Sequence, residues 1–287
     1  MNRIREPHDF YPRLHLYRYE MKLRDLLAGT IPGDALSHLS NHFEVIGDIA
    51  ILALHPGLEP YKKAVAAAIL ANRRNIYTVL NKTKMVSGGD RTATYEILAG
   101  NTTVALHREF GFEYRLDVTR SFFNTHLAYE RIRVADQVEP GENVLVPFCG
   151  VGPFAIPAAA RGARVIAVEK NHDAFLWLNE NVSLNGVREV ITAIEGDAFD
   201  PSILPRTRFD RIIIPTPYGM DAILDILSPL VAPGGMIHLY TFRSREEIPA
   251  LLDEYERKRF SVTFSRSCGN VAPGISRWVF DLGKESG

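Results

Sequence analysis

The sequence has few of the features that mark secreted, membrane-bound or zinc-binding proteins. Only two of its 287 residues are cysteines, Cys149 and Cys268, and neither belongs to a CxxC or Cys/His pattern. This scarcity predicts a reduced, cytoplasmic setting and argues against a structural zinc site, so we expect no metal. No apolar run approaches the ~20 residues of a membrane helix, and the N-terminal stretch lacks the apolar core of a signal peptide.

An excess of charge of either sign is also missing. The chain has 33 Lys and Arg residues against 34 Asp and Glu residues, which gives a formal net charge of -1. No global basic field would attract nucleic acid, so an RNA partner would have to meet a local basic patch. Hydrophobic residues make up 46% and charged residues 23%, as in ordinary globular proteins, and the length suits two domains. These quantities do not predict an oligomeric state.

The two halves of the chain have different patterns. Up to about residue 121, short strand candidates such as HFEVIGDIAILAL surround an alanine-rich helix, which predicts a smaller α+β domain. From Glu142 onward, strands and helices alternate. Such alternation predicts a parallel sheet covered by helices, and two closing strands would add an antiparallel edge. We expect domains at residues 1–121 and 122–287, with a bridging helix at about 122–138.

The segment FCGVGPF, residues 148–154, joins a predicted strand to a predicted helix. Gly150 and Gly152 let the backbone approach a ligand closely and present amide donors at the start of the helix. The next strand ends at Glu169, about twenty residues later, where a carboxylate can accept hydrogen bonds from both hydroxyls of a ribose. The third strand ends near Asp197, where a carboxylate could hold the amine of an adenine. The three strand ends predict a nucleoside site.

The type of nucleoside follows from what the loop omits. A dinucleotide site normally has a third glycine, but Ile156 or a neighbour takes that place here. The loop also has no basic residue for a pyrophosphate. S-adenosylmethionine is therefore favoured over a dinucleotide, and a tight turn with nothing bound stays as the third possibility.

The stretch NVLVPFCGVGPFAIPAAARGARVIAVEKNHDAFLWLNENVSLNGV resembles a family of archaeal and eukaryotic tRNA-modifying enzymes. These are the tRNA guanine-37 N1-methyltransferases and the related wybutosine-pathway aminocarboxypropyl transferases. The likeness continues in VIGDIAIL, GDRTATYEILAG, FEYRLDVTRSFFN, LAYERIRV and VAPGISRWVFDL, in the same order. It implies a class I methyltransferase domain, an α/β Rossmann-like fold, behind a smaller RNA-facing domain. It also implies an S-adenosylmethionine-dependent methyltransferase, with tRNA as partner, that acts on N1 of guanine 37 beside the anticodon.

The resemblance also implies roles for individual residues. Those that would contact the cofactor are Phe122, Phe148, Gly150, Val151, Gly152, Phe154, Glu169, Lys170, Asp197 and Ala198. Glu130 matches the proposed general base that accepts the proton of guanine N1, and Arg91 matches an arginine proposed to steady the guanine. Without the resemblance, Glu130 would be interpreted as an exposed helix carboxylate paired with a neighbouring arginine. Arg91 would be interpreted as a solvated loop residue.

Three positions depart from the family pattern. Val146 stands where the family has an acid, which removes one contact to the amino-acid end of the cofactor. His126 replaces an arginine, and Pro215 stands where an asparagine frames the target base. Proline offers neither a side-chain donor nor an N–H, so Thr216 or Tyr218 would have to supply the contacts, with Tyr218 stacking on a base. We expect His126, Pro215, Thr216 and Tyr218 to lie at the substrate.

Other activities are compatible with the same motifs. The chain could transfer the aminocarboxypropyl group to a wybutosine precursor in tRNA, or it could methylate a protein or a small molecule. It could also be an RNA-binding module that holds the cofactor without turnover.

Overall fold

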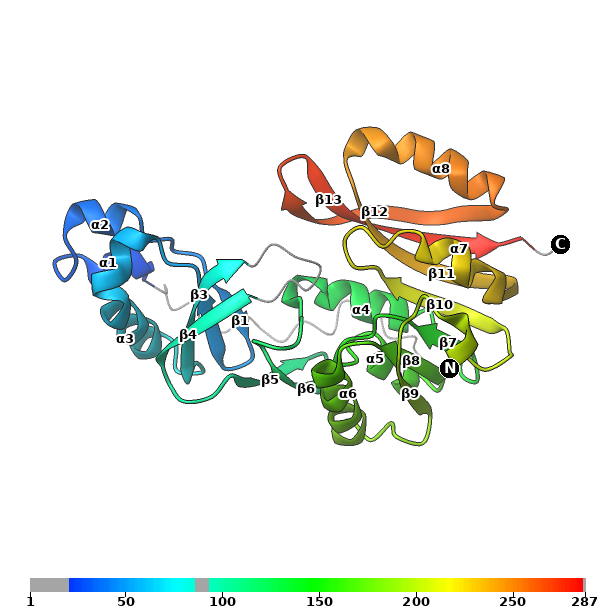
Figure 1. Cartoon of the computed structure of the whole chain (residues 1–287), viewed down its shortest axis with the longest axis horizontal. Helices are drawn as coiled ribbons and strands as arrows, with labels where there is room; N and C mark the ends of the chain where they lie inside the picture. The colour runs from blue at the N-terminus through cyan, green and yellow to red at the C-terminus, as the bar shows by residue number, and fades with distance from the viewer. Residues whose placement is uncertain (1–20, 86–92, 286–287) are drawn as a thin grey trace, which may run out of the picture.

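The computed structural model describes residues 21–85 and 93–285, which form two lobes (Figure 1). The first lobe, drawn from blue to cyan, contains a four-stranded sheet in the order β1-β2-β3-β4, with α1 and α3 packed on it. A separate two-stranded hairpin, β5 and β6, follows. The bounds in this part are α1 (Leu23–Leu27), α2 (Gly33–Ser37), β1 (Glu44–Ile46), β2 (Ile49–Leu52), α3 (Lys62–Asn72), β3 (Thr78–Met85), β4 (Ala93–Ala99), β5 (Val104–Glu109) and β6 (Phe112–Asp117).

The second lobe is built on a seven-stranded sheet in the order β12-β13-β11-β10-β7-β8-β9. Strands β7 to β11 pair in parallel, while β13 runs antiparallel to β11 and β12 antiparallel to β13. The predicted parallel sheet with an antiparallel edge is therefore confirmed. Its elements are α4 (Ala128–Ala135), β7 (Asn143–Val146), α5 (Ala155–Ala160), β8 (Arg164–Glu169), α6 (His172–Leu184), β9 (Ile191–Glu195), β10 (Phe209–Pro215), α7 (Ile223–Leu227), β11 (Val231–Arg243), α8 (Ile248–Arg257), β12 (Phe260–Ala272) and β13 (Ile275–Lys284).

Alternation along the strands divides the core of the second lobe into two layers. Successive side chains of a strand point to opposite faces of the sheet. Val144 and Val146 pack in the layer formed with α4, α5 and α6, whereas Leu145 packs with Ile223 of α7 and Leu251 of α8. Because helices cover both faces, the open edge at the carboxyl ends of the parallel strands is left for a ligand.

The turn of the first hairpin, between β1 and β2, is packed against β5. Gly47 has a φ of 58°, and a Cβ there would lie 2.3 Å from the carbonyl oxygen of Leu106. The carboxylate of Asp48 accepts a hydrogen bond from the Leu106 amide at 3.3 Å. A side chain at residue 47 would push the first sheet away from the hairpin, so this contact requires glycine.

The β5–β6 hairpin is attached to α6 of the second lobe. Asn181 is fully buried and accepts a hydrogen bond from the Arg115 amide at 2.7 Å. Asn185, directly after α6, accepts one from the Glu113 amide at 3.0 Å. The expected division at residue 121 places the hairpin in the first domain, whereas these hydrogen bonds join it to the second lobe.

The bridging helix is shorter than the sequence predicts. The side chain of Asn124 accepts a hydrogen bond from the amide of His126 at 2.9 Å, and a single 3-10 turn then leads into α4. An asparagine in this role begins a helix and does not continue one, so Phe122 and Phe123 remain in an extended loop. The α-helix ends at Ala135. The loop before it forms part of the cavity wall described next.

Candidate active site

A cavity of about 410 Å³ lies at the carboxyl ends of the central strands of the second lobe. One part, which we name the glycine-loop end, is lined by the loop after β7 and by the last residue of β8, and includes Phe148, Cys149, Gly150, Pro153, Phe154 and Glu169. The other part, which we name the aromatic end, is lined from β10, β11 and β13 by Pro215, Thr216, Pro217, Tyr218, Phe242 and Arg277. The extended loop at Phe122–Asn124 also lines the cavity.

The glycine loop follows β7 with backbone angles in the left-handed region. The φ angle is 51° at Phe148, 55° at Gly150 and 96° at Gly152. A Cβ on Gly152 would lie 2.8 Å from Cδ1 of Leu178, because α6 packs directly against the loop. Val151 is fully buried beneath it. Gly150 is therefore favoured by its backbone angle, which Phe148 also adopts, and Gly152 is required by both its angle and its close contact with α6.

Glu169 holds the glycine loop from the neighbouring strand. One carboxylate oxygen accepts a hydrogen bond from the Gly150 amide at 2.7 Å, and the other accepts one from the Asn171 amide at 2.8 Å. Burial raises the pKa of Glu169, while the Asn171 and Gly150 amides act in the opposite direction. The carboxylate also lines the cavity, so it can accept hydrogen bonds from the hydroxyls of a ribose placed there.

The end of the third strand of the nucleoside site lies outside the cavity wall. Asp197 accepts a hydrogen bond from Lys170 Nζ at 2.8 Å and another from the Phe199 amide at 3.0 Å. The Lys170 contact, followed by the Phe199 amide, lowers the pKa of Asp197. Ala198 is buried beside them. The structure thus brings Glu169 to the cavity. Five of the ten predicted cofactor residues do not line it, namely Val151, Gly152, Lys170, Asp197 and Ala198.

Aromatic rings form much of the remaining wall. Phe122, Phe148 and Phe154 all line the cavity, as expected for residues that contact a cofactor, and the exposed fraction of Phe122 is 77%. The ring of Phe154 lies 5.2 Å from that of Tyr240, which the sequence did not single out. A cavity wall of aromatic rings suits an aromatic ligand.

Three of the four predicted substrate residues, Pro215, Thr216 and Tyr218, lie at the aromatic end. The Thr216 hydroxyl and amide both point to the carbonyl oxygen of Ile214, at 3.4 Å and 2.9 Å, and Thr216 is 3% exposed. The hydroxyl is therefore directed to the backbone and not into the cavity. Tyr218, by contrast, is 52% exposed.

Two residues of the aromatic end were missed by sequence reasoning. Phe242 of β11 lies 5.4 Å from the ring of Tyr218, and the guanidinium carbon of Arg277 lies 4.8 Å from the centroid of Phe242. Phe242 and Arg277 are opposite each other in the β11–β13 ladder. The motif VAPGISRWVFDL contains Arg277, but only the order of strands in the sheet brings it to the cavity.

His126 belongs to a neighbouring hollow. This second space, of about 480 Å³, lies between the end of the first sheet and the bridging loop, and is lined by His42, Phe43, Glu44, Phe122, Phe123, Asn124 and His126. It shares Phe122–Asn124 with the main cavity. His126 is exposed and does not line the main cavity.

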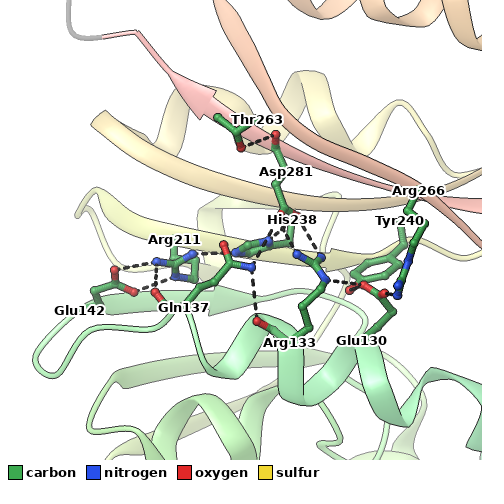
Figure 2. Close-up of polar contacts among 10 residues, drawn as sticks. All are labelled: Glu130, Arg133, Gln137, Glu142, Arg211, His238, Tyr240, Thr263, Arg266 and Asp281. Atoms are coloured by element: carbon green, nitrogen blue, oxygen red, sulfur yellow. Dashed lines mark hydrogen bonds and ion pairs between the residues drawn. The ribbon is translucent and has the colours of Figure 1, made fainter. Parts of the chain in front are cut away.

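Glu130 is buried and is not an exposed helix carboxylate. Figure 2 shows its polar contacts. Its carboxylate receives hydrogen bonds from Arg133 Nε at 2.9 Å and from the Tyr240 hydroxyl at 3.1 Å, and it forms a very short contact with Arg266. The ring of Tyr240 lines the cavity, while its hydroxyl points to Glu130. Tyr240 therefore lies between the cavity and this carboxylate.

The same network continues beneath the C-terminal strands (Figure 2). Asp281 of β13 accepts hydrogen bonds from Arg133 Nη1 at 2.6 Å and from His238 Nδ1 at 2.7 Å. The other ring nitrogen of His238 lies 2.7 Å from Arg211 Nη1, and Arg211 is paired with Glu142. Since arginine can only donate, His238 accepts at Nε2 and donates at Nδ1, which is the neutral tautomer.

Burial and hydrogen bonding shift the pKa values of His238 and Asp281 in defined directions. Burial lowers the pKa of His238, although its contact with Asp281 acts the other way. Burial alone would raise the pKa of Asp281, but the hydrogen bonds from His238 and Arg133 hold it well below its usual value. The network is therefore assembled around a neutral histidine and a charged aspartate.

Some predictions concern residues or features that the structure does not place at the site. Arg91 lies outside the described residues. Within residues 21–85 and 93–285, no group of three or more His, Cys, Asp or Glu side chains is arranged to hold a metal ion. None of the helices in the described part of the chain combines the length and the apolar character needed to cross a membrane.

Comparison with known families gives two adjoining matches. Residues 105–264 match the family described as the TRM5/TYW2 methyltransferase domain, and residues 23–103 match the TYW2 N-terminal domain. Among curated proteins, the chain is 34% identical over 213 residues to tRNA (guanine(37)-N(1))-methyltransferase Trm5b of Pyrococcus abyssi, covering 74% of this chain and 63% of that protein. It is 37% identical over 180 residues to tRNA(Phe) (4-demethylwyosine(37)-C(7)) aminocarboxypropyltransferase of Pyrococcus horikoshii, covering 62% and 64%. The chain therefore spans less than two thirds of the length of either relative.

Solved structures show the same fold. The crystal structure of Trm5b from Pyrococcus abyssi superimposes with a TM-score of 0.79 at 30% identity, over 95% of this chain and 81% of that one. P. horikoshii TYW2 in complex with MeSAdo gives a TM-score of 0.74 at 30% identity, over 91% and 97%. The complex of aTrm5 and tRNALeu gives 0.81 at 25% identity, over 93% and 79%. The expected class I methyltransferase fold and the expected family are confirmed.

Proposed function

The chain belongs to the family of the TRM5/TYW2 methyltransferase domain, and from this we propose that it is an S-adenosylmethionine-dependent tRNA methyltransferase that methylates N1 of guanine 37. One observation carries the proposal. A single cavity joins the glycine loop and Glu169 to the aromatic end at Tyr218 and Phe242, so that a nucleoside cofactor and a planar base can lie in one space. The names of the relatives and the MeSAdo complex of one neighbour agree with this assignment.

The cofactor fits the glycine-loop end by the chemistry of its wall. Glu169 would accept the ribose hydroxyls, and the rings of Phe122, Phe148 and Phe154 would contact the adenosine. We keep Asp197 as the proposed partner of the adenine amine, which would meet a carboxylate already held by Lys170 and the Phe199 amide. When bound, S-adenosylmethionine supplies an electrophilic methyl group on a sulfonium. Val146 offers no acid to the amino-acid end of the cofactor.

Guanine N1 is a poor nucleophile until its proton leaves, and we assign that proton to Glu130. Glu130 is separated from the cavity by Tyr240, whose ring lines the wall and whose hydroxyl donates to the carboxylate. Proton acceptance by Glu130 would require one of its present hydrogen bonds to change, since Arg133, Arg266 and Tyr240 all contact it. Arg91 stays in its proposed role beside the guanine. The target base would have to leave the tRNA stack to enter the cavity.

The domain division is proposed at residue 104 instead of 121. The β5–β6 hairpin is hydrogen-bonded to α6, and the two family matches meet between residues 103 and 105. The first lobe would then face the tRNA. The proposed substrate and two free cysteines, Cys149 and Cys268, both suit the reducing cytoplasm.

The direct test is incubation of the protein with labelled S-adenosylmethionine and an unmodified tRNA transcript, followed by mass spectrometry of the nucleosides. We expect 1-methylguanosine at position 37 and release of adenosylhomocysteine. Label on a protein or a small molecule instead of tRNA would contradict the proposal. So would tight cofactor binding with no turnover on any tRNA.

The Glu130→Gln variant tests the proton acceptor. Loss of a general base typically slows a reaction about 100- to 10,000-fold, so we expect at least a 100-fold slower single-turnover methyl transfer. Glu142→Gln is the matched control, because Glu142 is paired with Arg211 in the same network and does not line the cavity. If Glu130→Gln methylates as fast as Glu142→Gln, the role of Glu130 in proton transfer is wrong.

Two findings favour a second activity, transfer of the aminocarboxypropyl group. Residues 23–103 match the TYW2 N-terminal domain, and a relative of 37% identity is an aminocarboxypropyltransferase. Transfer of the aminocarboxypropyl group would leave methylthioadenosine as the by-product in place of adenosylhomocysteine. The same mass-spectrometric experiment, run with tRNA that carries a wybutosine precursor, distinguishes the two reactions.

A further inference from the structure

Arg277 is a half-buried cation in the wall of the aromatic end. It lies on β13 directly opposite Phe242 of β11, and its guanidinium carbon lies 4.8 Å from the centre of the Phe242 ring. Glu169 ends β8 and Arg277 lies on β13. These are the first and the last of five neighbouring strands in the order β8, β7, β10, β11 and β13. Four strand spacings amount to about 19 Å, so Arg277 lies on the substrate side and beyond the reach of a ribose bound at Glu169.

Arg277 differs from the other arginines around the cavity. Arg131, which also lines the cavity, is paired with Glu109, while Arg133 is paired with Asp281 and Arg266 with Glu130. Arg277 has no carboxylate partner among the side chains that the structure describes, and burial lowers its pKa. A guanidinium that is removed from water without an anionic or acceptor partner is costly, so the missing acceptor is expected from a ligand.

Most other groups at the aromatic end offer no hydrogen-bond donor to a base edge. Pro215 has neither an N–H nor a polar side chain, and both polar groups of Thr216 point to the Ile214 carbonyl. Tyr218 and Phe242 offer ring faces. The arrangement therefore combines stacking surfaces with one cationic donor, the guanidinium edge of Arg277, which alone at this end can donate two parallel hydrogen bonds. A planar base with acceptor atoms along one edge matches it, whereas a phosphate would gain nothing from the rings.

We propose that Arg277 binds the O6 and N7 edge of the target guanine and thereby selects guanine over adenine. This proposal rests on the function proposed above. A guanidinium can donate to O6 and N7 together, while adenine presents an amine at the position of O6 and would oppose the donors. The same contact would stabilise the negative charge that develops on O6 when N1 loses its proton. Arg277 thus provides the donor that Pro215 and Thr216 lack.

The experiment measures the coupling between Arg277 and N7. Binding of tRNA with guanosine or 7-deazaguanosine at position 37 is measured by titration, and single-turnover methyl transfer is measured on both tRNAs. Both assays use the wild-type protein, Arg277→Gln and Arg188→Gln. Arg188 is an exposed arginine far from the cavity wall, and its substitution removes the same charge. Circular dichroism and S-adenosylmethionine affinity report whether Arg277→Gln is folded.

We expect the 7-deaza substitution to weaken wild-type binding and transfer about tenfold, as the loss of a base-edge contact does. Arg188→Gln should show the same sensitivity, and Arg277→Gln should show none, because the contact is already gone. Equal weakening of both tRNAs by Arg277→Gln, without any effect of the 7-deaza substitution on wild type, would indicate a phosphate contact and overturn the proposal. Should Arg277→Gln misfold, the 7-deaza substitution with wild-type protein still decides, since no effect there overturns the proposal.

The two proposals can fail separately. Normal methyl transfer to guanosine by wild type without coupling to N7 would overturn the role of Arg277 and leave the proposed function standing. Absence of both tRNA binding and transfer in the wild type would overturn both. Binding that is sensitive to N7 without any methyl transfer would support Arg277 as a base-binding residue and contradict the proposed reaction.

Discussion

The two ends of the cavity are built in different ways. The glycine-loop end comes from one continuous βαβ segment, and backbone angles, amide donors and a single carboxylate, Glu169, define it. The aromatic end is assembled from three strands, and its wall lies over a buried network of paired charges that includes Glu130 and Asp281. Substitutions at the first end should therefore act on cofactor binding, whereas substitutions beneath the second should act on stability and on the target base.

Breaking the network beneath the aromatic end should have the largest effect. Asp281 is buried and accepts hydrogen bonds from Arg133 and His238, so Asp281→Asn leaves Arg133, whose side chain is 13% exposed, without its main partner. We expect the free energy of unfolding to fall by about 3–5 kcal/mol. Urea unfolding followed by circular dichroism measures it.

Asp253→Asn on the exposed side of α8 is the matched control and should stay within about 0.5 kcal/mol of wild type. The folded fraction of Asp281→Asn should bind S-adenosylmethionine with nearly unchanged affinity. A cofactor affinity that falls together with stability would show that the two ends are not independent.

Substitution at the glycine-loop end should weaken the binding of the cofactor. Glu169→Gln converts an acceptor-only carboxylate into an amide that can meet the ribose hydroxyls and the Gly150 and Asn171 amides with only one oxygen. Hydrogen bonds to a charged group contribute about 1.5–3 kcal/mol each, so we expect cofactor affinity to fall about 10- to 100-fold in isothermal titration. The control is Glu195→Gln, because Glu195 pairs with Glu169 in the β8–β9 register and is bonded to His172 outside the cavity. Equal losses in both variants would count against a ribose site at Glu169.

Sequence reasoning located the glycine-loop end because that end is local. Gly150, Gly152 and Glu169 fall in one strand–helix–strand unit, and parallel strands bring their carboxyl ends to one edge. Asp197, one strand further, was assigned on the same basis, yet it does not line the cavity. A strand end can be predicted from the pattern, but the direction of a side chain after the strand depends on the loop.

The aromatic end could not be found in the same way. Arg277 lies in a strand whose place beside β11 is fixed only when the sheet is complete, and no pattern in SRWVFDL marks it as facing a ligand. Glu130 was singled out only through family resemblance, and its contact with Arg266 comes from a strand far along the chain. Asn181 resembles a surface residue of α6, but it is buried because it hydrogen-bonds the β5–β6 hairpin. Each case depends on a neighbour that lies far away in the sequence.

The smallest expected effect is the pH dependence that His238 of the buried network contributes to stability. Burial keeps the pKa of His238 below its usual value, so near pH 6 the unfolded chain binds a proton that the folded protein does not. The free energy of unfolding should therefore decrease as the pH falls from about 7 to 5, with a slope of up to about 1.4 kcal/mol per pH unit.

The experiment has to separate His238 from Glu169, whose raised pKa changes stability with pH in the opposite direction, so the comparison is made in the Glu169→Gln background. His238→Gln keeps one donor for Asp281 and one acceptor for Arg211 but does not titrate, and urea unfolding from pH 5 to 8 should show a shallower slope. An unchanged slope in His238→Gln would assign the pH dependence to other histidines and not to the buried network.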